Sequence, residues 1–127
     1  MGNAAMEKIV LFNVGPETEK FIAGIAGNMR IKVINAATGM YTETLERIVN
    51  NEAAEASSSD VLLDGLPSES LMLMCGLSEK HMDRLLAKLR QSSKRVDYKS
   101  VLTPTNAKWT LKRLMLEMER EKKALGG

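Results

Sequence analysis

The stretch Leu71-Met72-Leu73-Met74-Cys75, followed directly by Gly76, is an uninterrupted apolar run of strand length that ends at a glycine. A second run, Ile9-Val10-Leu11-Phe12, ends shortly before Gly15-Pro16. A strand with one solvated face alternates apolar and polar residues, whereas apolar residues at consecutive positions need cover on both faces of a sheet. The two runs therefore predict the central strands of a sheet that is covered on both sides.

A segment with helical periodicity follows each predicted strand. Phe21, Ile25 and Met29 recur at helical spacing behind the first strand, and Ser78 is placed to cap a helix that carries Met82 and Leu89 on one face. The predicted strands cover residues 7–14, 30–34, 71–75 and 96–102, and the predicted helices cover residues 17–29, 42–49, 78–89 and the segment from 103 onward. The order is therefore four strand–helix units.

This alternation predicts an α/β fold. Consecutive strands joined by helices are expected to be parallel and connected by right-handed crossovers. The polar-interleaved strand Val96–Leu102 suits a sheet edge. We therefore expect a three-layer α/β/α sandwich around a four-stranded, mostly parallel sheet in the order 2-1-3-4. The alternative is a ferredoxin-like α+β plait. Gly15 and Gly76, which each close a strand, suggest a duplicated βαβα unit with slight identity between the halves.

The length of 127 residues and the hydrophobic content of 44% fit a single α/β domain over residues 1–127. Residues 52–68 have the composition of a flexible connector, in which Asp60–Gly65 has the pattern of a short extra strand. No apolar run approaches the roughly 20 residues that span a membrane. The N-terminal residues lack an export signal, and the single cysteine, Cys75, cannot form an internal disulfide. A cytoplasmic protein without a membrane partner is expected.

The charge is unevenly distributed along the chain. The formal net charge is only +2, but residues 1–79 hold 5 Lys/Arg against 11 Asp/Glu, whereas residues 80–127 hold 13 against 5. Such asymmetry is typical of a surface that meets an anionic partner. It is also compatible with two solvated faces of opposite charge.

Motifs for catalysis or cofactors are sparse. Asn13-Val14-Gly15-Pro16 lacks the glycines of a Walker loop or a dinucleotide fingerprint. His81, the single histidine, is expected on the surface of its helix, and together with Cys75 it supplies too few ligands for zinc. No catalytic residue, metal or cofactor is assigned, and a protein without enzymatic activity is favoured.

The carboxyl ends of the predicted strands are the expected place for a ligand, because parallel sheets bind ligands beyond that edge. If all strands run in one direction, this edge brings together Asn13, Cys75 and the turn after the last strand. The candidate binding residues are Lys99, Thr103, Thr105, Asn106, Trp109, Asn13 and Cys75. The alternative is a local role, in which Thr103 is the N-cap of the final helix and Pro104 its first residue.

The final helix is predicted to be amphipathic. The stripe assigned to the core consists of Leu111, Leu114, Met115, Met118 and, further along, Leu125. The opposite side carries the candidate interface residues Trp109, Lys112, Arg113, Leu116, Arg120 and Lys123. Tryptophan and arginine are typical interface anchors, so this side is expected to meet a protein partner or a second copy of the chain. The alternative is that Trp109 packs on the edge of the sheet while the basic residues are only solvated.

The segment Asp97–Leu102, the following Thr103-Pro104-Thr105-Asn106 and then Trp109-Thr110-Leu111 resemble the bacterial domain-of-unknown-function family 3783. The apolar strand at 71–75 and the helix at 82–89 fit the same family, so the resemblance covers residues 70–120. It implies a bacterial source and no particular activity, and it directs attention to Lys99, Thr103, Pro104, Thr105, Asn106 and Trp109.

A fainter likeness is to response-regulator receiver domains. The first strand, Asp60–Asp64 and the late strand before Pro104 follow the order of those domains. However, Phe12-Asn13 stand where a receiver domain has paired acids, which argues against Mg²⁺-dependent phosphorylation of Asp64.

The sequence is therefore compatible with three candidate functions. The first is a non-enzymatic regulatory or protein-interaction module that acts through the final helix. The second is a small anionic ligand-binding protein, or an enzyme, that uses the pocket at the strand carboxyl ends. The third is nucleic-acid binding by the basic half of the chain.

Overall fold

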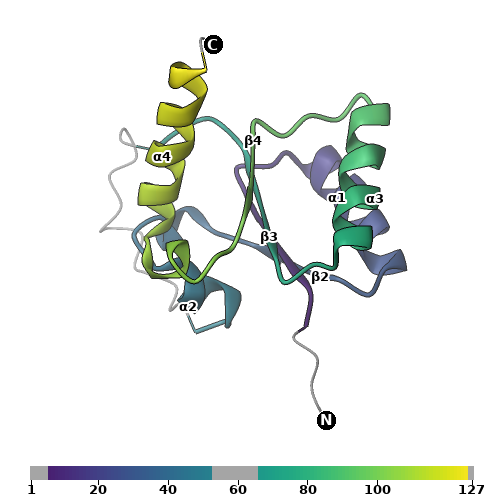
Figure 1. Ribbon diagram of the computed structural model, residues 1–127, viewed down its shortest axis with the longest axis horizontal. Helices are drawn as coiled ribbons and strands as arrows, with labels where there is room; N and C mark the ends of the chain where they lie inside the picture. The colour runs from purple at the N-terminus through teal and green to yellow at the C-terminus, as the bar shows by residue number, and fades with distance from the viewer. Residues whose placement is uncertain (1–5, 53–65, 126–127) are drawn as a thin grey trace. The chain divides into compact units, whose positions relative to one another are not determined.

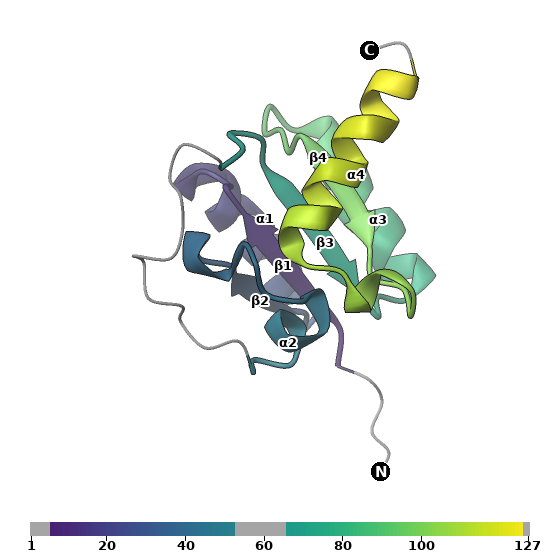
Figure 2. The same cartoon turned by 90° about the vertical axis from the view of Figure 1, so that its left-hand side faces the viewer.

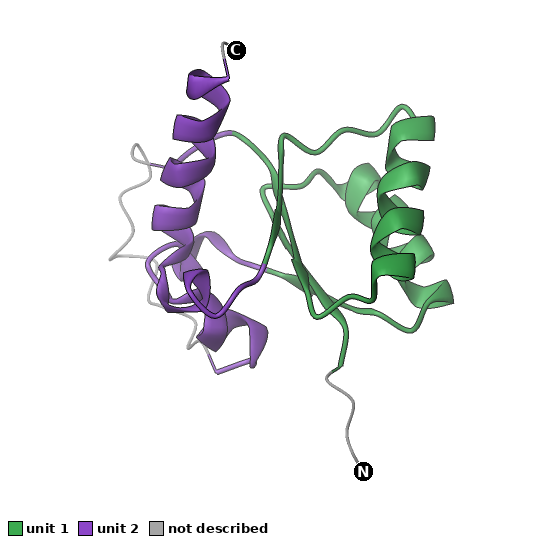
Figure 3. Cartoon of the chain, in the orientation of Figure 1, with its two compact units in different colours: residues 1–35, 69–101 green, residues 36–68, 102–127 purple. Residues whose placement is uncertain are grey.

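The structure, a computed structural model, describes residues 6–52 and 66–125. Its strands are β1 (Lys8–Phe12), β2 (Lys32–Asn35), β3 (Leu71–Cys75) and β4 (Tyr98–Val101) (Figure 1). Its α-helices are α1 (Pro16–Asn28), α2 (Leu45–Val49), α3 (Glu79–Gln91) and α4 (Leu111–Ala124), and η1 (Thr38–Met40) and η4 (Asn106–Lys108) are short 3₁₀ helices. The chain divides into two compact units, unit 1 with residues 1–35 and 69–101 and unit 2 with residues 36–68 and 102–127 (Figure 3).

Unit 1 holds all four strands of the described sheet. The strand order is β2-β1-β3-β4, as predicted, and the fold is of the α/β class (Figure 2). β1 pairs in parallel with β2, and β3 pairs in parallel with β4, so the sheet is mostly parallel. These two parallel pairs do not fit the ferredoxin-like alternative, in which neighbouring strands are antiparallel.

The two central strands, however, are antiparallel to each other, with Lys8 opposite Cys75 and Phe12 opposite Leu71. The expectation that all consecutive strands are parallel was therefore wrong. A helix packed on the sheet fixes the direction of only the two strands that it connects, as α1 does for β1 and β2 and α3 does for β3 and β4. The connection from β2 to β3 runs through residues 36–68, which belong to unit 2, and a connection of that length can return to the sheet in either direction.

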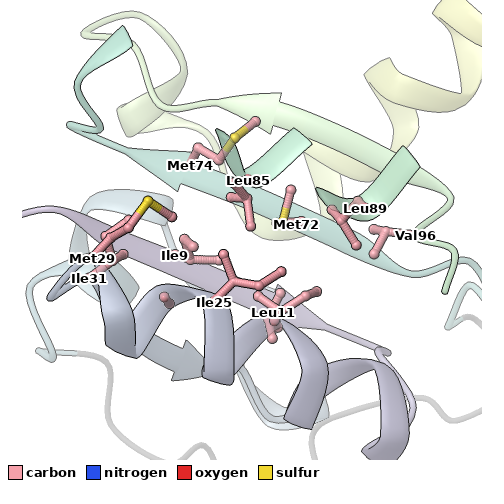
Figure 4. Packing of buried hydrophobic residues seen from close by; sticks show 12 residues of the cluster. Ile9, Leu11, Ile25, Met29, Ile31, Met72, Met74, Leu85, Leu89 and Val96 are labelled. Atoms are coloured by element: carbon pink, nitrogen blue, oxygen red, sulfur yellow. The ribbon is translucent and has the colours of Figure 1, made fainter. Parts of the chain in front are cut away.

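The core of unit 1 lies between the sheet and the two helices α1 and α3 (Figure 4). The sheet contributes Ile9, Leu11, Met72 and Met74, and the helices contribute Ile22, Ile25, Ala26, Leu85 and Leu89, with Met29 at the C-cap of α1. Burying each large side chain of this kind contributes about 1.5–3 kcal/mol. The intervening strand residues Val10, Phe12 and Leu73 are at most 1% exposed. The central strands are thus buried on both faces, as their consecutive apolar residues predicted.

In unit 2, the final helix begins later than predicted. Thr103 is not its N-cap: the N–H of Thr103 donates to Asn106 Oδ1 at 2.8 Å, and the N–H of Asn106 donates to Thr103 Oγ1 at 3.0 Å. This reciprocal pair closes a separate turn that continues into η4. α4 then starts at Leu111, and the Oγ1 of its N-cap Thr110 accepts from the Arg113 N–H at 3.1 Å.

The predicted core stripe of α4 is correct for its first two turns. Leu111, Leu114 and Met115 are buried, and Met118 is partly buried. Leu125 is 87% exposed and does not belong to the core, because the helix ends at Ala124 and Leu125 is its C-cap.

Two segments of unit 2 are joined by a reciprocal pair of backbone hydrogen bonds. The Leu45 N–H donates to the Trp109 carbonyl at 2.9 Å, and the Leu111 N–H donates to the Glu43 carbonyl at 3.0 Å. Thr44 and Thr110 face each other at the centre as an antiparallel bridge. Each threonine is followed by Leu-x-Arg, in residues 44–47 and 110–113. The two halves of the chain thus share their element order and a short sequence signature, which supports the duplication.

Residues 53–65 lie outside the described residues, and with them most of the predicted connector and the possible strand at Asp60–Gly65. Among the helices that the structure describes, none has the length and apolar character needed to cross a membrane.

Candidate anion-binding pocket

The turn between α3 and β4 is built around Ser92. This serine is the C-cap of α3, and its Oγ donates to the Leu89 carbonyl at 2.8 Å while accepting from the Lys94 N–H at 3.0 Å. Both hydrogen bonds hold the backbone tightly as it leaves the helix. The side chains of the following residues therefore project from a fixed turn.

A pocket of about 460 Å³ lies at this turn, within the size range of small-ligand sites. Its lining consists of Leu89, Arg90, Ser92, Ser93, Lys94, Arg95, Val96 and Lys99. Leu89 and Val96 are at most 6% exposed and provide an apolar base. The other residues provide four cationic side chains and two hydroxyl groups, and none of the lining residues is acidic. The pocket is therefore strongly electropositive.

Within residues 6–52 and 66–125, Lys94 is the one cation of this pocket that has an ion pair. Lys94 Nζ lies 3.5 Å from a carboxylate oxygen of Glu17, but that carboxylate is 89% exposed, and such exposed pairs are weak. Lys99 Nζ donates to the neutral Val96 carbonyl at 3.3 Å, which keeps the ammonium group next to the pocket lining. Phosphate and carboxylate groups are the ligands that ammonium and guanidinium groups bind best.

The carboxyl end of α3 explains part of this basic cluster. The negative end of a helix dipole favours cations in the last turn, where Arg90 lies. This effect fades beyond the last turn, and Lys94, Arg95 and Lys99 all come after the helix ends. Helix stabilisation therefore does not account for three of the four cations.

The other predicted binding residues do not share one edge of the sheet. Because β1 and β3 are antiparallel, Asn13 and Cys75 lie at opposite ends of the sheet, which corrects the expected ligand edge. Asn13 adopts a left-handed conformation with φ of 59°, and its Nδ2 donates to the Glu69 carbonyl at 3.1 Å. Its position serves a turn beside the start of β3.

Cys75 faces the interior. It is 3% exposed, and its Sγ lies 3.7 Å from the Leu73 carbonyl. Burial raises the pKa of the thiol to about 12, while the charge of Lys8 acts in the opposite direction. Since only the thiolate is a strong nucleophile or metal ligand, Cys75 has the properties of a packing residue.

The Thr-Pro-Thr-Asn turn belongs to unit 2, whereas Lys99 belongs to unit 1. Asn106 is 7% exposed, and its side chain holds the turn through the Thr103 N–H. Thr103 and Thr105 are exposed. The local interpretation, that Thr103 caps the long helix, was therefore wrong, and these residues instead close a turn before η4.

The predicted interface residues lie on and next to α4. Trp109 is half-buried and ends η4, and the Arg113 guanidinium stacks 4.4 Å from its ring centroid. Leu116 is 49% exposed. Most of the cations here pair within the helix: Arg113 and Arg120 with Glu117 at 3.9 and 3.6 Å, and Lys123 with Glu119 at 3.6 Å, while Lys112 is exposed.

His81 is partly buried and has a partner that the sequence did not indicate. Its Nδ1 lies 2.8 Å from the Glu7 carboxylate, which also accepts from the Ser78 N–H at 2.7 Å. That backbone hydrogen bond is the main cause of a lowered Glu7 pKa, and His81 adds to it, while burial opposes it. The trio ties the start of β1 to the start of α3. In the described part of the chain, no group of three His, Cys, Asp or Glu side chains is arranged to hold a metal.

Sequence reasoning missed Arg90, Ser92, Ser93, Lys94 and Arg95 as pocket residues and found only Lys99. The available signal was the run of four cations from Arg90 to Lys99 within the strongly basic second half. This run was not predicted as a site because a ligand was expected at the strand carboxyl ends, whereas this pocket lies at the amino end of β4.

The model of the family described as a domain of unknown function, DUF3783, matches residues 61–125, slightly more than half of the chain. The chain belongs to this family. Comparisons with curated proteins and with solved structures gave no match. The DUF3783 region contains β3, α3, β4 and α4, and hence every residue of the basic pocket, but neither β1 nor α1.

Proposed function

We propose that this DUF3783 protein is a binding module whose pocket between α3 and β4 takes a small ligand with phosphate groups or clustered carboxylates. The observation that supports this most is the presence of four cationic side chains and the Ser93 hydroxyl around about 460 Å³, with no acidic residue in the lining. Guanidinium groups bind such anions through paired hydrogen bonds, and the lysines add charge.

Binding fits this lining better than catalysis does. General acid–base chemistry near neutral pH usually uses an imidazole or a carboxylate, and the lining residues include neither. The family resemblance supports a bacterial source, and a single buried thiol supports a cytoplasmic location.

The direct test is calorimetry with inorganic phosphate, pyrophosphate and a nucleoside triphosphate. We expect the wild type to bind at least one of them, and the double variant Arg95→Ala/Lys99→Ala to bind it at least about tenfold more weakly. Lys80→Ala is the matched control, because Lys80 is an exposed cation of α3 outside the pocket. Equal losses in the control and the pocket variant, or no binding at millimolar ligand, would argue against the proposal.

A second candidate function is the protein-interaction module that acts through α4. Leu116 supports it, because a leucine that is 49% exposed lies among Lys112, Arg113 and Arg120. Trp109, half-buried under Arg113, adds an aromatic anchor next to it. Aromatic and arginine side chains around an apolar centre are typical of interfaces.

Sedimentation and partner capture test this second candidate. Trp109→Ala with Arg113→Glu should weaken self-association or partner binding by at least about tenfold. A wild type that stays monomeric at all concentrations and captures no partner rules out this role of α4.

A further inference from the structure

Two further hollows along α1 and α3 are linked to the basic pocket through shared lining residues, and we call the three together the groove. One of them is a hollow of about 510 Å³ between the two helices, lined by Lys20, Phe21, Gly24, Ile25, Asn28, Met29, Arg84 and Lys88. A third hollow of about 250 Å³ is lined by Phe21, Lys88, Gln91 and Ser92. It shares Phe21 and Lys88 with the hollow between the helices and Ser92 with the basic pocket, so the three follow one another.

The part between the helices differs chemically from the basic pocket. Ile25 and Met29 are at most 8% exposed and, with the half-buried Phe21, provide an apolar floor. The exposed cations Lys20, Arg84 and Lys88 border that floor, and none of its lining residues is acidic. A ligand that fills it needs apolar groups for the floor and negative charges for the borders.

Gly24 lies in the lining of this hollow, with open space where a side chain would start. A Cβ atom built at Gly24 meets no other atom within 4 Å, and the same is true of Gly27 in the same helix. Gly24 lines the groove, whereas Gly27 does not. The two glycines therefore provide one position where a side chain fills the groove and one where it leaves the groove unchanged.

We propose that this groove binds an acidic peptide segment with apolar anchor residues, supplied by a partner protein. The inference rests on the proposed function, because the basic pocket forms part of the groove. Cations line all three hollows, so an extended acidic chain can contact all of them, whereas a compact anion fills only one. A single-stranded nucleic acid fits less well, since such sites stack bases on successive aromatic rings and Phe21 is the only aromatic residue in these linings.

The test is fluorescence anisotropy with a labelled peptide of about 16 residues. Its leucines are spaced to lie on one face of a helix and its glutamates on the other. Two matched peptides replace every glutamate by glutamine or every leucine by serine. We expect the full-length chain to bind the parent peptide at least about tenfold more tightly than either control peptide, a difference of about 1.4 kcal/mol. Tighter binding of a single-stranded oligonucleotide than of the parent peptide overturns the inference.

Gly24→Leu should weaken binding of the parent peptide by at least about tenfold, and Gly27→Leu should leave it unchanged. Both changes raise helix propensity, so the fold is expected to persist, and circular dichroism checks this. Arg84→Glu with Lys88→Glu gives a second, purely electrostatic test. Equal effects of the two glycine variants, or no effect of the charge reversal, overturn the inference.

Pyrophosphate separates the two proposals. Gly24→Leu should bind it as the wild type does, because Gly24 is not in the basic pocket. Binding of pyrophosphate without binding of the parent peptide overturns the peptide groove alone. Binding of the peptide without binding of phosphate, pyrophosphate or the nucleoside triphosphate overturns the small-ligand pocket and supports the groove, and absence of all binding overturns both.

Discussion

At the scale of single residues, Thr44 and Thr110 have the same side chain in paired positions but different surroundings. They face each other across an antiparallel bridge. Thr110 Oγ1 accepts the Arg113 N–H and caps α4. Thr44 Oγ1, in contrast, is a buried oxygen without a hydrogen-bond partner within the described part of the chain. A buried hydroxyl costs free energy when it is not hydrogen-bonded.

Replacing each threonine by valine, which has nearly the same shape, should therefore change stability in opposite directions. We expect Thr44→Val to raise the free energy of unfolding by about 1 kcal/mol, because an unsatisfied hydroxyl is removed. Thr110→Val should lower it by about 1 kcal/mol, because the helix loses its cap. Urea denaturation of both variants measures the difference, and a loss of stability in Thr44→Val would show that its hydroxyl is satisfied.

Cys75 should be chemically silent in the folded protein. It is buried, and its thiol pKa is raised to about 12 by that burial. A thiol with this pKa is almost entirely protonated at pH 8, and reagents reach it only after the chain opens. We expect its rate of modification by a disulfide reagent to rise with urea in parallel with unfolding. Rapid modification without urea would contradict the buried position.

At the scale of elements, the sequence predicted the apolar strands, their order in the sheet and the Ser78 cap. It could not predict that β1 and β3 are antiparallel. An apolar strand that is buried on both faces has the same residue pattern whether its neighbour runs parallel or antiparallel to it. The start of α4 was placed too early for a related reason. Thr103-Pro104 has the composition of a helix start, but the Thr103–Asn106 side-chain pair closes a turn first. The Leu-x-Arg sequence after both threonines was the available signal for the true start.

Glu7 connects two elements and makes stability depend on pH. Its folded-state pKa is lowered, mainly by the Ser78 N–H, so its contribution is complete above the ordinary carboxyl pKa of 4.5. That contribution is lost as the pH falls through the lowered value, because the protonated carboxyl group no longer attracts its partners. Glu7→Gln should therefore lower the free energy of unfolding by about 1 kcal/mol at pH 7 and by less at pH 3. Urea titrations at both pH values test this, and an effect of equal size at both would exclude the charge as the cause.

At the scale of the whole molecule, the candidate site was only partly visible in the sequence. The excess of positive charge after residue 80 predicted an anionic partner, and Lys99 was identified. Which cations gather in one pocket depends on the turn that Ser92 closes, and this hydrogen bonding has no periodic pattern in the sequence. The sequence therefore predicts how much positive charge the second half carries. Which of these cations lie together in one pocket can be seen only in the folded structure.

The DUF3783 region alone should not fold independently in this chain. Residues 61–127 contain β3 and β4 but not β1, which pairs with β3 at five positions. Without β1, the apolar strand Leu71–Cys75 becomes an unpaired edge, and a two-stranded sheet is marginally stable at best. We expect a fragment of residues 61–127 to aggregate or to unfold without cooperativity, and co-expression with residues 1–60 to give a soluble one-to-one complex. Size-exclusion chromatography and urea denaturation test both statements. A monomeric, cooperatively unfolding fragment 61–127 would show that β1 is dispensable, and that the family region forms a stable sheet by itself.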